Sequence, residues 1–507
     1  MASKVKAGTL AVANILILLL ITQLVANFDN TSLGQPNNDY ILSAYVFMNT
    51  SCFDFTYGGH YHELDQSGTP ISRNKFLGIE AWIIKGALDY YNYSWDLEAL
   101  THAIDTFNTI EVRMRNPSHT YNARMVEDWS SAIIGNSRTM ENSCLIRALV
   151  ELYKHTGNVA YYETAIWLMF YIHYFHRNTA TGGYHIEVDE FGNPNLTYYP
   201  YGYLPGYVAL ACASLLTFDP TNATFLEELN YALNFALESY WDSPNGGYCS
   251  IYTPSGSIYE SFKPLHMQSV MIEAFVAGYL FTANMTYRYH AIEIANLILN
   301  HWTDAYPGFV MDVSRTLSVT NSKRNAIYLA YTARAFLDLY LITGNTTYLD
   351  SGVEAMNFIR LYHYDPSYLG YYAECYASGN PADTTKKPGY QSDILSALVR
   401  YDFGDEPPPT TTEPPTTTDP PPTTPTTPTI PSLGFLLPLT IIGGTIIALQ
   451  VVVIAVLLTQ RRQKSVKYPR LISSADSSEP KRIRFCAGCG SQIRPDDRFC
   501  AGCGKAV

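Results

Sequence analysis

The chain has 507 residues, of which 47% are hydrophobic and only 15% charged, so most of it is globular and not disordered. A formal net charge of −12 argues against nucleic acid as the partner of the main body. The charge is uneven, because residues 27–405 carry a net −18 and residues 460–507 a net +7. An acidic body and a basic tail on one chain indicate that the two parts lie in different cellular compartments.

Two apolar segments predict the topology. Lys4 and Lys6 precede an apolar run within residues 1–26, which is typical of a signal peptide or a signal anchor, and the sequence leaves both open. Residues 433–459 carry no charge and are long enough to cross about 30 Å of hydrocarbon as a transmembrane helix. The basic linker 460–484 follows at once, so the tail is expected in the cytoplasm. We therefore expect a cell-membrane protein, single-pass or double-pass, with lipid as a partner and residues 27–432 outside.

Between the globular body and the second apolar segment lies a stretch made almost only of proline and threonine, residues 406–432. Such a composition cannot bury a core and predicts an extended, semi-rigid stalk.

The outer domain, residues 27–405, contains six repeats of about 62 residues. Each repeat is expected to hold a turn of small residues, a short β-hairpin such as residues 184–193, a first helix such as 269–282 or 326–343, and a second helix such as 348–361. The second repeat, near Tyr121, is degenerate and lacks the glycine hairpin. The turns of small residues are Gly58-Gly59, Gly182-Gly183, Gly246-Gly247, Pro307-Gly308 and Leu369-Gly370.

Twelve helices in six hairpins bury every apolar face if they close into a ring, with an open superhelix as the rival arrangement. Two motifs, Asp-x3-Gly-Gly-Tyr at 242–248 and Leu-Tyr-Lys-His-Thr-Gly-Asn at 152–158, carry a family resemblance. The chain resembles the six-hairpin glycosidase-like superfamily, which includes N-acylglucosamine 2-epimerases, α-1,6-mannanases and unsaturated glucuronyl hydrolases. The resemblance covers about residues 40–403. It implies an all-α fold, an (α/α)6 toroid with short β-hairpin loops.

Sugar chemistry needs carboxyl groups and aromatic rings. The resemblance to the mannanase branch favours the adjacent Glu127 and Asp128 as catalytic acids, although adjacent acids in a loop are usually only solvated. Resemblance to the epimerase branch favours His266, which starts an inner helix, although later repeats offer no second histidine there. Asp242 and its analogues in other turns are expected to brace the turns. The predicted substrate-binding aromatics are Trp129, Tyr201, Tyr203 and Trp241.

Seven Asn-x-Ser/Thr sequons predict N-glycosylation outside the cell. Four of them, Asn92, Asn222, Asn284 and Asn345, are expected in the short turn between the two helices of a repeat, which would leave the opposite, hairpin-bearing face free for a ligand. The alternative is that such turns collect asparagine for conformational reasons. The predicted sites are Asn30, Asn49, Asn92, Asn195, Asn222, Asn284 and Asn345.

The last 23 residues, 485–507, predict a structural zinc site. The spacing C-x2-C-x10-C-x2-C supplies four thiolates for tetrahedral Zn²⁺, and a redox dithiol pair is the less favoured alternative. The segment resembles a short prokaryotic zinc-ribbon module. Five further cysteines lie in the outer domain, where a disulfide among Cys52, Cys249 and Cys375 stays open. The predicted zinc ligands are Cys486, Cys489, Cys500 and Cys503.

The sequence thus predicts a membrane-anchored, cell-surface carbohydrate-active protein that acts on a glycan, with a glycosidase as the leading hypothesis and an epimerase less favoured. The second hypothesis is a noncatalytic receptor for glycans or peptides. It would signal ligand binding to a cytoplasmic protein partner through the zinc ribbon. A purely structural surface protein is the third.

Overall fold

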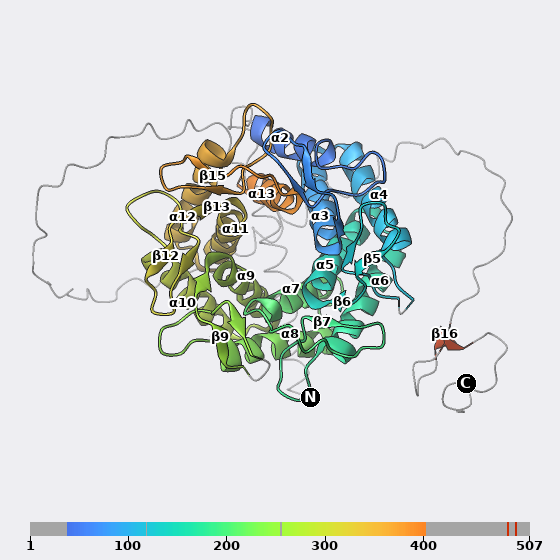
Figure 1. Ribbon diagram of the computed structural model, residues 1–507. Coiled ribbons are helices and arrows are strands. Elements are labelled where there is room, and N and C mark those ends of the chain that lie inside the picture. The colour runs from blue at the N-terminus through green and yellow to red at the C-terminus, as the bar shows by residue number, and fades with distance from the viewer. Residues whose placement is uncertain (1–37, 118, 254–255, 402–483, 486–491, 494–507) are drawn as a thin grey trace, which may run out of the picture. The chain divides into compact units, whose positions relative to one another are not determined.

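The computed structural model describes residues 38–117, 119–253 and 256–401, with the short segments 484–485 and 492–493. Within residues 38–401, twelve α-helices form two concentric rings (Figure 1). The inner helices are α3 (Leu77–Ser94), α5 (Thr139–Thr156), α7 (Leu204–Leu216), α9 (Leu265–Thr282), α11 (Ala326–Thr343) and α13 (Pro388–Arg400). The outer helices are α2 (Asn38–Asn49), α4 (Leu97–Arg113), α6 (Val159–Tyr171), α8 (Ala223–Phe235), α10 (Met285–His301) and α12 (Thr346–Phe358).

The inner ring is closed, because α13 packs against α3. Small residues allow this contact. A Cβ atom on Gly86 would lie 3.1 Å from the Cα of Ser392, and one on Gly389 would lie 2.5 Å from the ring of Trp82. The predicted toroid is therefore confirmed, and the open superhelix is excluded.

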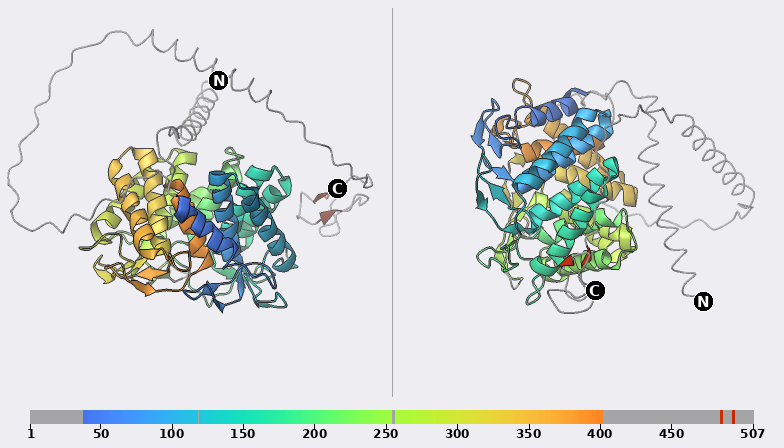
Figure 2. Two further views of the ribbon diagram at one scale, coloured as in Figure 1. Left: turned by 90° about the horizontal axis from the view of Figure 1, so that it is seen from above. Right: turned by 90° about the vertical axis from the view of Figure 1, so that its right-hand side faces the viewer.

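Short β-hairpins gather on one end of the ring, which we call the loop face (Figure 2). The inner helices begin at this face, and the helix–helix turns lie at the opposite end, the turn face. The hairpin strands are β1 (Glu63–Leu64) with β2 (Pro70–Ser72), β4 (Arg124–Met125) with β5 (Ala132–Ile134), β8 (Ile251–Tyr252) with β9 (Ile258–Glu260), β11 (Asp312–Val313) with β12 (Val319–Asn321), and β14 (Glu374–Cys375) with β15 (Pro381–Asp383). In the third repeat, β7 (Glu187–Val188) makes a single bridge to Pro194.

Each repeat pairs with the next through the residues just before its inner helix. Four of these segments are strands, namely β3 (Lys75–Phe76), β6 (Ser137–Arg138), β10 (Lys263–Pro264) and β13 (Arg324–Asn325), and they pair with β4, β7, β11 and β14. The third repeat uses a bridge from Tyr201 to Ile251, and the sixth joins the first through Lys386 and Leu64. Backbone pairing therefore runs around the whole ring.

A buried ion pair braces the same position in three repeats. The Lys75 Nζ lies 2.8 Å from the Asp54 carboxylate, and neither side chain is exposed. Lys263–Asp242 and Lys386–Asp365 repeat the pair at 2.9 Å each. Burial acts to raise the pKa of Asp54, but hydrogen bonds from Lys75 and the turn backbone outweigh it and hold the pKa below its usual value. The expectation that Asp242 and its analogues brace the turns agrees with this geometry.

Two details of the repeat differ from expectation. The second repeat does carry a hairpin, because β4 pairs with β5. One residue at the tip of each hairpin has a positive φ, in the left-handed region of the backbone. This residue is Trp129, with φ 62°, in the second repeat, and Gly68 and Gly379 in the first and sixth repeats. The missing glycine therefore marks a changed residue and not a missing turn. Helix α9 also begins four residues before Ser269, because Pro264 suits the position ahead of a helix and Leu265 and Met267 are buried.

The membrane and tail predictions fall largely outside the described residues. No helix in the described part is long and apolar enough to cross a bilayer, and residues 1–26, 406–432 and 433–459 are not among those described. Of the tail, the structure describes β16 (Arg484–Phe485) and β17 (Gln492–Ile493), which pair antiparallel.

We expect Lys75→Met to lower the free energy of unfolding by about 3–5 kcal/mol, because it leaves the Asp54 charge buried and unpaired. The matched control is Lys154→Met, which removes an exposed ion pair to Glu151 and should cost at most about 1 kcal/mol. Urea unfolding of both variants measures the difference. Equal small losses would show that the buried pair does not brace the turn.

Candidate functional site

The candidate site lies at the inner rim, which we define as the residues directly before and within the first turn of the inner helices on the loop face. Further along α9, α11 and α13, charged side chains of the three helices form a buried cluster. Arg334 on α11 bonds Glu273 at 3.1 Å and Asp393 at 2.7 Å. The Tyr207 and Tyr331 hydroxyls meet at 3.2 Å, although α9 lies between their helices in the ring. A ligand is therefore expected above this layer, at the rim.

His266, in the first turn of α9, is a half-buried histidine without a hydrogen-bond partner on Nδ1. Its ring centroid lies 4.2 Å from that of Tyr328 and 5.5 Å from that of Tyr203. Burial lowers the pKa of His266 to about 3, so the imidazole is neutral at physiological pH. The unpartnered Nδ1 is itself buried, so a ligand would have to meet the other ring nitrogen, Nε2, which in a neutral imidazole can accept or donate a hydrogen bond.

Two carboxyl groups flank this cluster. Asp312 on β11 lies opposite Pro264, two residues before His266, and Glu374 on β14 lies opposite Asn325, three residues before Tyr328. Burial raises the pKa of Asp312; a 3.1 Å hydrogen bond from the Asn321 amide offsets part of this, and the Glu374 carboxylate adds to it. Glu374 is ion-paired with Lys323 at 2.9 Å.

The two carboxyl groups lie in different environments, because burial raises the pKa of Asp312 whereas the Glu374 carboxylate forms an ion pair with Lys323. Such a difference is what assigns acid and base roles to a pair of carboxyl groups. Sequence reasoning placed both residues on the loop face but did not single them out. The signal available was their equivalent position at the start of a hairpin.

The tyrosines of the third repeat complete the rim. The rings of Tyr201 and Tyr203 are parallel within 5° with centroids 5.3 Å apart, and Tyr203 contacts His266. The structure thus brings together three residues that the sequence proposed for the site, namely Tyr201, Tyr203 and His266.

The other predicted residues lie elsewhere. Glu127 and Asp128 sit at the tip of the β4–β5 hairpin, where Glu127 pairs with Arg73 at 2.8 Å and Asp128 accepts a hydrogen bond from the Ser130 backbone. The Trp129 indole is buried and donates to the Tyr57 carbonyl.

Trp241 lies in the outer layer, with its ring centroid 4.2 Å from that of His290 on α10. The structure does not group it with His266.

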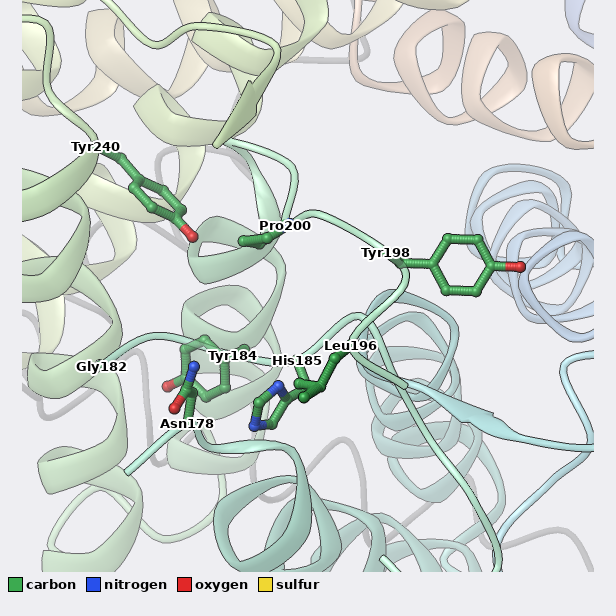
Figure 3. Close-up of a pocket in the computed structure, with 8 residues that line it drawn as sticks. All are labelled: Asn178, Gly182, Tyr184, His185, Leu196, Tyr198, Pro200 and Tyr240. Carbon is green, nitrogen blue, oxygen red and sulfur yellow. The ribbon is translucent and has the colours of Figure 1, made fainter. Parts of the chain in front are cut away.

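A separate hollow, of about 290 Å³ including its open side, lies in the third repeat (Figure 3). Burial lowers the pKa of His185, which lines it. Tyr198 stands at its edge and points away from the other lining residues (Figure 3). The hollow is lined by Asn178, Gly182, Tyr184, His185, Leu196, Tyr198, Pro200 and Tyr240. It brings no carboxyl group beside the histidine, and we do not assign the chemistry to it.

Among the described residues, no group of three His, Cys, Asp or Glu side chains is placed to hold a metal ion. Five cysteines of the ring are buried free thiols, so Cys52, Cys249 and Cys375 form no disulfide in this structure. The other two are Cys144 and Cys212. The four predicted zinc ligands lie outside the described residues.

Three of the predicted glycosylation sites have a structural role. The Asn222, Asn284 and Asn345 side chains accept backbone hydrogen bonds as N-caps of α8, α10 and α12, on the turn face. Asn158 caps α6 in the same way without being a sequon. Capping uses the side-chain oxygen and leaves the amide nitrogen to other contacts, and that of Asn222 donates to the Asp219 carboxylate at 3.0 Å.

The remaining sequons are spread more widely. Asn92 lies in the last turn of α3, Asn49 ends α2 on the loop face, and Asn195 donates to Glu187. Asn30 is outside the described residues.

Comparison with known proteins adds to this geometry. The family model described as N-acylglucosamine 2-epimerase matches residues 168–316, a segment that contains His266 and Asp312. A cellobiose 2-epimerase of Ruminococcus albus is 33% identical over 136 residues, which are 25% of this chain and 34% of that protein. The alignment thus spans about a third of the length of the curated relatives it matches.

Solved structures extend the likeness to the whole ring. Cellobiose 2-epimerase from Bacillus thermoamylovorans superposes with a TM-score of 0.62 at 13% identity, covering 71% of this chain and 99% of that chain. An inactive α-1,6-mannanase variant from a Salegentibacter species, solved with α-1,6-mannotriose, gives 0.54 at 14% identity over 72% and 99%. Residues 38–401 therefore have the six-hairpin (α/α)6 fold that these epimerases and mannanases share.

We expect the outer domain to lose stability as the pH falls from 7 to 5. Burial lowers the pKa of His102, His176 and His266 to about 3 and of His290 and His363 to about 4, so below pH 6.5 the unfolded chain binds protons that the folded chain does not. Each such histidine costs up to about 1.4 kcal/mol per pH unit in that range.

Urea unfolding at several pH values measures this slope. His266→Phe should make it shallower, whereas His119→Asn, at an exposed position, should leave it unchanged. An unchanged slope in His266→Phe would show that His266 is protonated in the folded protein.

Proposed function

We propose that this protein is a membrane-anchored, cell-surface carbohydrate-active enzyme that binds a sugar at the inner rim of its toroid. The observation that carries the proposal is the cluster of a neutral, unpartnered His266 between Tyr203 and Tyr328, flanked by Asp312 and Glu374. Aromatic faces suit sugar rings, and two carboxyl groups in different environments suit proton transfer to and from sugar oxygens.

Glycoside hydrolysis is the reaction that this site supports best. Asp312 would donate its proton to the glycosidic oxygen as the bond to the anomeric carbon breaks. Glu374 would then take a proton from the attacking water, or attack the anomeric carbon itself, according to the separation of the two groups. His266 would accept a hydrogen bond from a sugar hydroxyl.

Epimerisation is the second candidate, favoured by the match of residues 168–316 to the epimerase family and by a neutral imidazole at the rim. An epimerase must remove and return a proton at a sugar carbon, which calls for two groups on opposite sides. The positions equivalent to His266 on α11 and α13 are Ile327 and Gly389, which cannot do so. Hydrolysis therefore has the stronger structural support.

The decisive experiment screens the full chain in detergent on a glycan array and assays every hit for new reducing ends and for epimers. Asp312→Asn is expected to reduce turnover at least about a hundredfold while binding persists, because the acid is lost but the aromatic contacts remain. Glu127→Gln and Asp128→Asn test the hairpin tip in the same assay. If turnover is lost in Glu127→Gln and Asp128→Asn but not in Asp312→Asn, the catalytic groups lie at the hairpin tip and not at the inner rim.

Binding without turnover in the wild-type protein would contradict the enzyme and favour a noncatalytic glycan receptor. One observation already points that way, since the buried acids Asp54, Asp242 and Asp365 are committed to ion pairs with lysines.

We also propose that the four tail cysteines hold one structural Zn²⁺. The donor set of four thiolates fits tetrahedral zinc with no open position. Pairing of β16 with β17 supports a ribbon, because it brings Phe485, the residue before Cys486, opposite Gln492.

Metal analysis of the full chain should find one zinc per chain, and Cys486→Ser with Cys489→Ser should remove it. Retention of zinc in that double variant would place the metal elsewhere. The stability of the toroid, followed by urea unfolding, should not change.

A further inference from the structure

Glu141, the third residue of α5, places a carboxyl group at the inner rim, and the residue is only 9% exposed. Burial is the largest cause that raises the pKa of Tyr203, and the nearby charge of Glu141 adds to it. Tyr203 in turn contacts His266. The helices of Glu141 and His266, α5 and α9, both pack against α7 in the inner ring (Figure 1). Glu141 therefore belongs to the same rim as the proposed sugar site.

The fold does not require an acid at this position, because the other five inner helices supply an internal comparison. A buried carboxyl group costs free energy unless it is well paired, whereas an apolar side chain does not. On the neighbouring helix α3, the missing side chain of Gly78 leaves room for Glu141, since a Cβ atom there would lie 3.3 Å from the Glu141 Cγ. Ring packing therefore does not explain the carboxyl group. The equivalent positions hold apolar or aromatic residues, namely Ile79, Leu204, Met267, Tyr328 and Tyr390.

Glu141 shares one arginine, Arg138 on β6, with a second carboxyl group, that of Glu187 on β7. The Arg138 Nε donates a hydrogen bond to Glu187 at 2.8 Å, and the amides of Asn136 and Asn195 donate to it at 2.7 and 3.1 Å. Burial acts to raise the pKa of Glu187, but these hydrogen bonds outweigh it and hold the pKa below its usual value. The better bonded of the two carboxyl groups is thus Glu187.

The carboxyl group of Glu141 is paired less well. Its oxygen lies 3.7 Å from the Arg138 Nη1, which is longer than a normal hydrogen bond. Burial raises the pKa of Glu141, Arg138 offsets only part of this, and the charge of Glu187 adds to it. The other titratable groups beside it, Cys144 on its own helix and Tyr203 before α7, supply no positive charge. Glu141 and Arg138 thus keep hydrogen-bonding capacity that a ligand can use.

The chemistry of this pair suits two neighbouring hydroxyls of one sugar. A hydroxyl can donate a hydrogen bond to a carboxylate, and the oxygen of the next hydroxyl can accept one from a guanidinium group. Hydrogen bonds to charged groups are about twice as strong as those between neutral groups, so such contacts discriminate between ligands.

We propose that Glu141 is a specificity-determining residue that contacts the substrate, and that with Arg138 it binds two neighbouring hydroxyls of the sugar at the inner rim. This inference rests on the proposed function and adds to it the residues that select the sugar. A sugar that lacks either hydroxyl, or carries a substituent on it, binds weakly.

The experiment measures affinity by calorimetry on the full chain in detergent, with cellobiose and α-1,6-mannobiose as probes. At least one of them should bind the wild-type protein. Glu141→Gln should weaken that binding about tenfold or more, because a hydrogen bond to a charged group is lost. The matched control is Glu151→Gln near the other end of α5, where the carboxylate pairs with Lys154, and it should leave the affinity unchanged.

A second readout separates a contact with the sugar from a purely structural role. The probes are monodeoxy analogues of the bound disaccharide, each lacking one hydroxyl. One analogue should bind the wild-type protein about tenfold less well, and Glu141→Gln should weaken its binding no further, because the partner hydroxyl is already missing. Glu141→Met, which copies the residue of α9 at this position, should show the same pattern. Urea unfolding should find both variants at least as stable as the wild type, since neither buries an incompletely paired carboxyl group.

Three outcomes overturn the inference and leave sugar binding at the rim in place. They are an unchanged affinity in Glu141→Gln, an equal loss in Glu151→Gln, and a loss by the same factor for the disaccharide and for every analogue. Failure of the inference is thus distinguishable from failure of the proposed function. Absence of binding of both disaccharides to the wild-type protein would overturn both.

Discussion

Three of the six repeats share one physical constraint, the buried ion pair between a turn aspartate and the lysine that precedes an inner helix. Lys75 illustrates it. Its side chain holds Asp54 at the end of its own outer helix, while its backbone pairs with the hairpin of the next repeat. Lys386 does the same across the junction of the last and first repeats. Because both charges are fully buried, loss of either leaves an uncompensated charge, so the turn, the helix start and the neighbouring hairpin are fixed together.

This bracing fixes the backbone around the proposed site at the inner rim. The residues that follow each brace begin the inner helices, so their side chains are held in a ring of fixed radius. Asp312 and Glu374 come from different repeats, yet strand pairing places each beside the inner helix of the repeat before it. Neighbouring repeats thus place two carboxyl groups, one of which has its pKa raised by burial, on the strands beside the inner helices that carry His266 and Tyr328.

Sequence reasoning recovered the ring but not its details, for physical reasons. The 62-residue period and the apolar faces determine six helical hairpins, and closure follows from burying every face. Trp129 concealed the second hairpin, because a tryptophan in the left-handed region gives no turn signal. Tyr201, Tyr203 and His266, which were proposed from the sequence, lie together because the segments before α7 and α9 occupy equivalent positions in neighbouring repeats. The pair of Asp312 and Glu374 was not singled out from the sequence. The position of each residue depends on cross-strand register and burial, which strands of two residues do not reveal in sequence.

The central claim is that sugar binds at the inner rim. Hydrogen–deuterium exchange of the full chain, with and without a bound oligosaccharide from the array, tests it directly. We predict slower exchange in the segments 199–207, 262–270, 310–314 and 372–376, with no change at the hairpin tip 126–131 or on the turn face. Protection confined to the tip, or to the hollow around His185, would contradict the account.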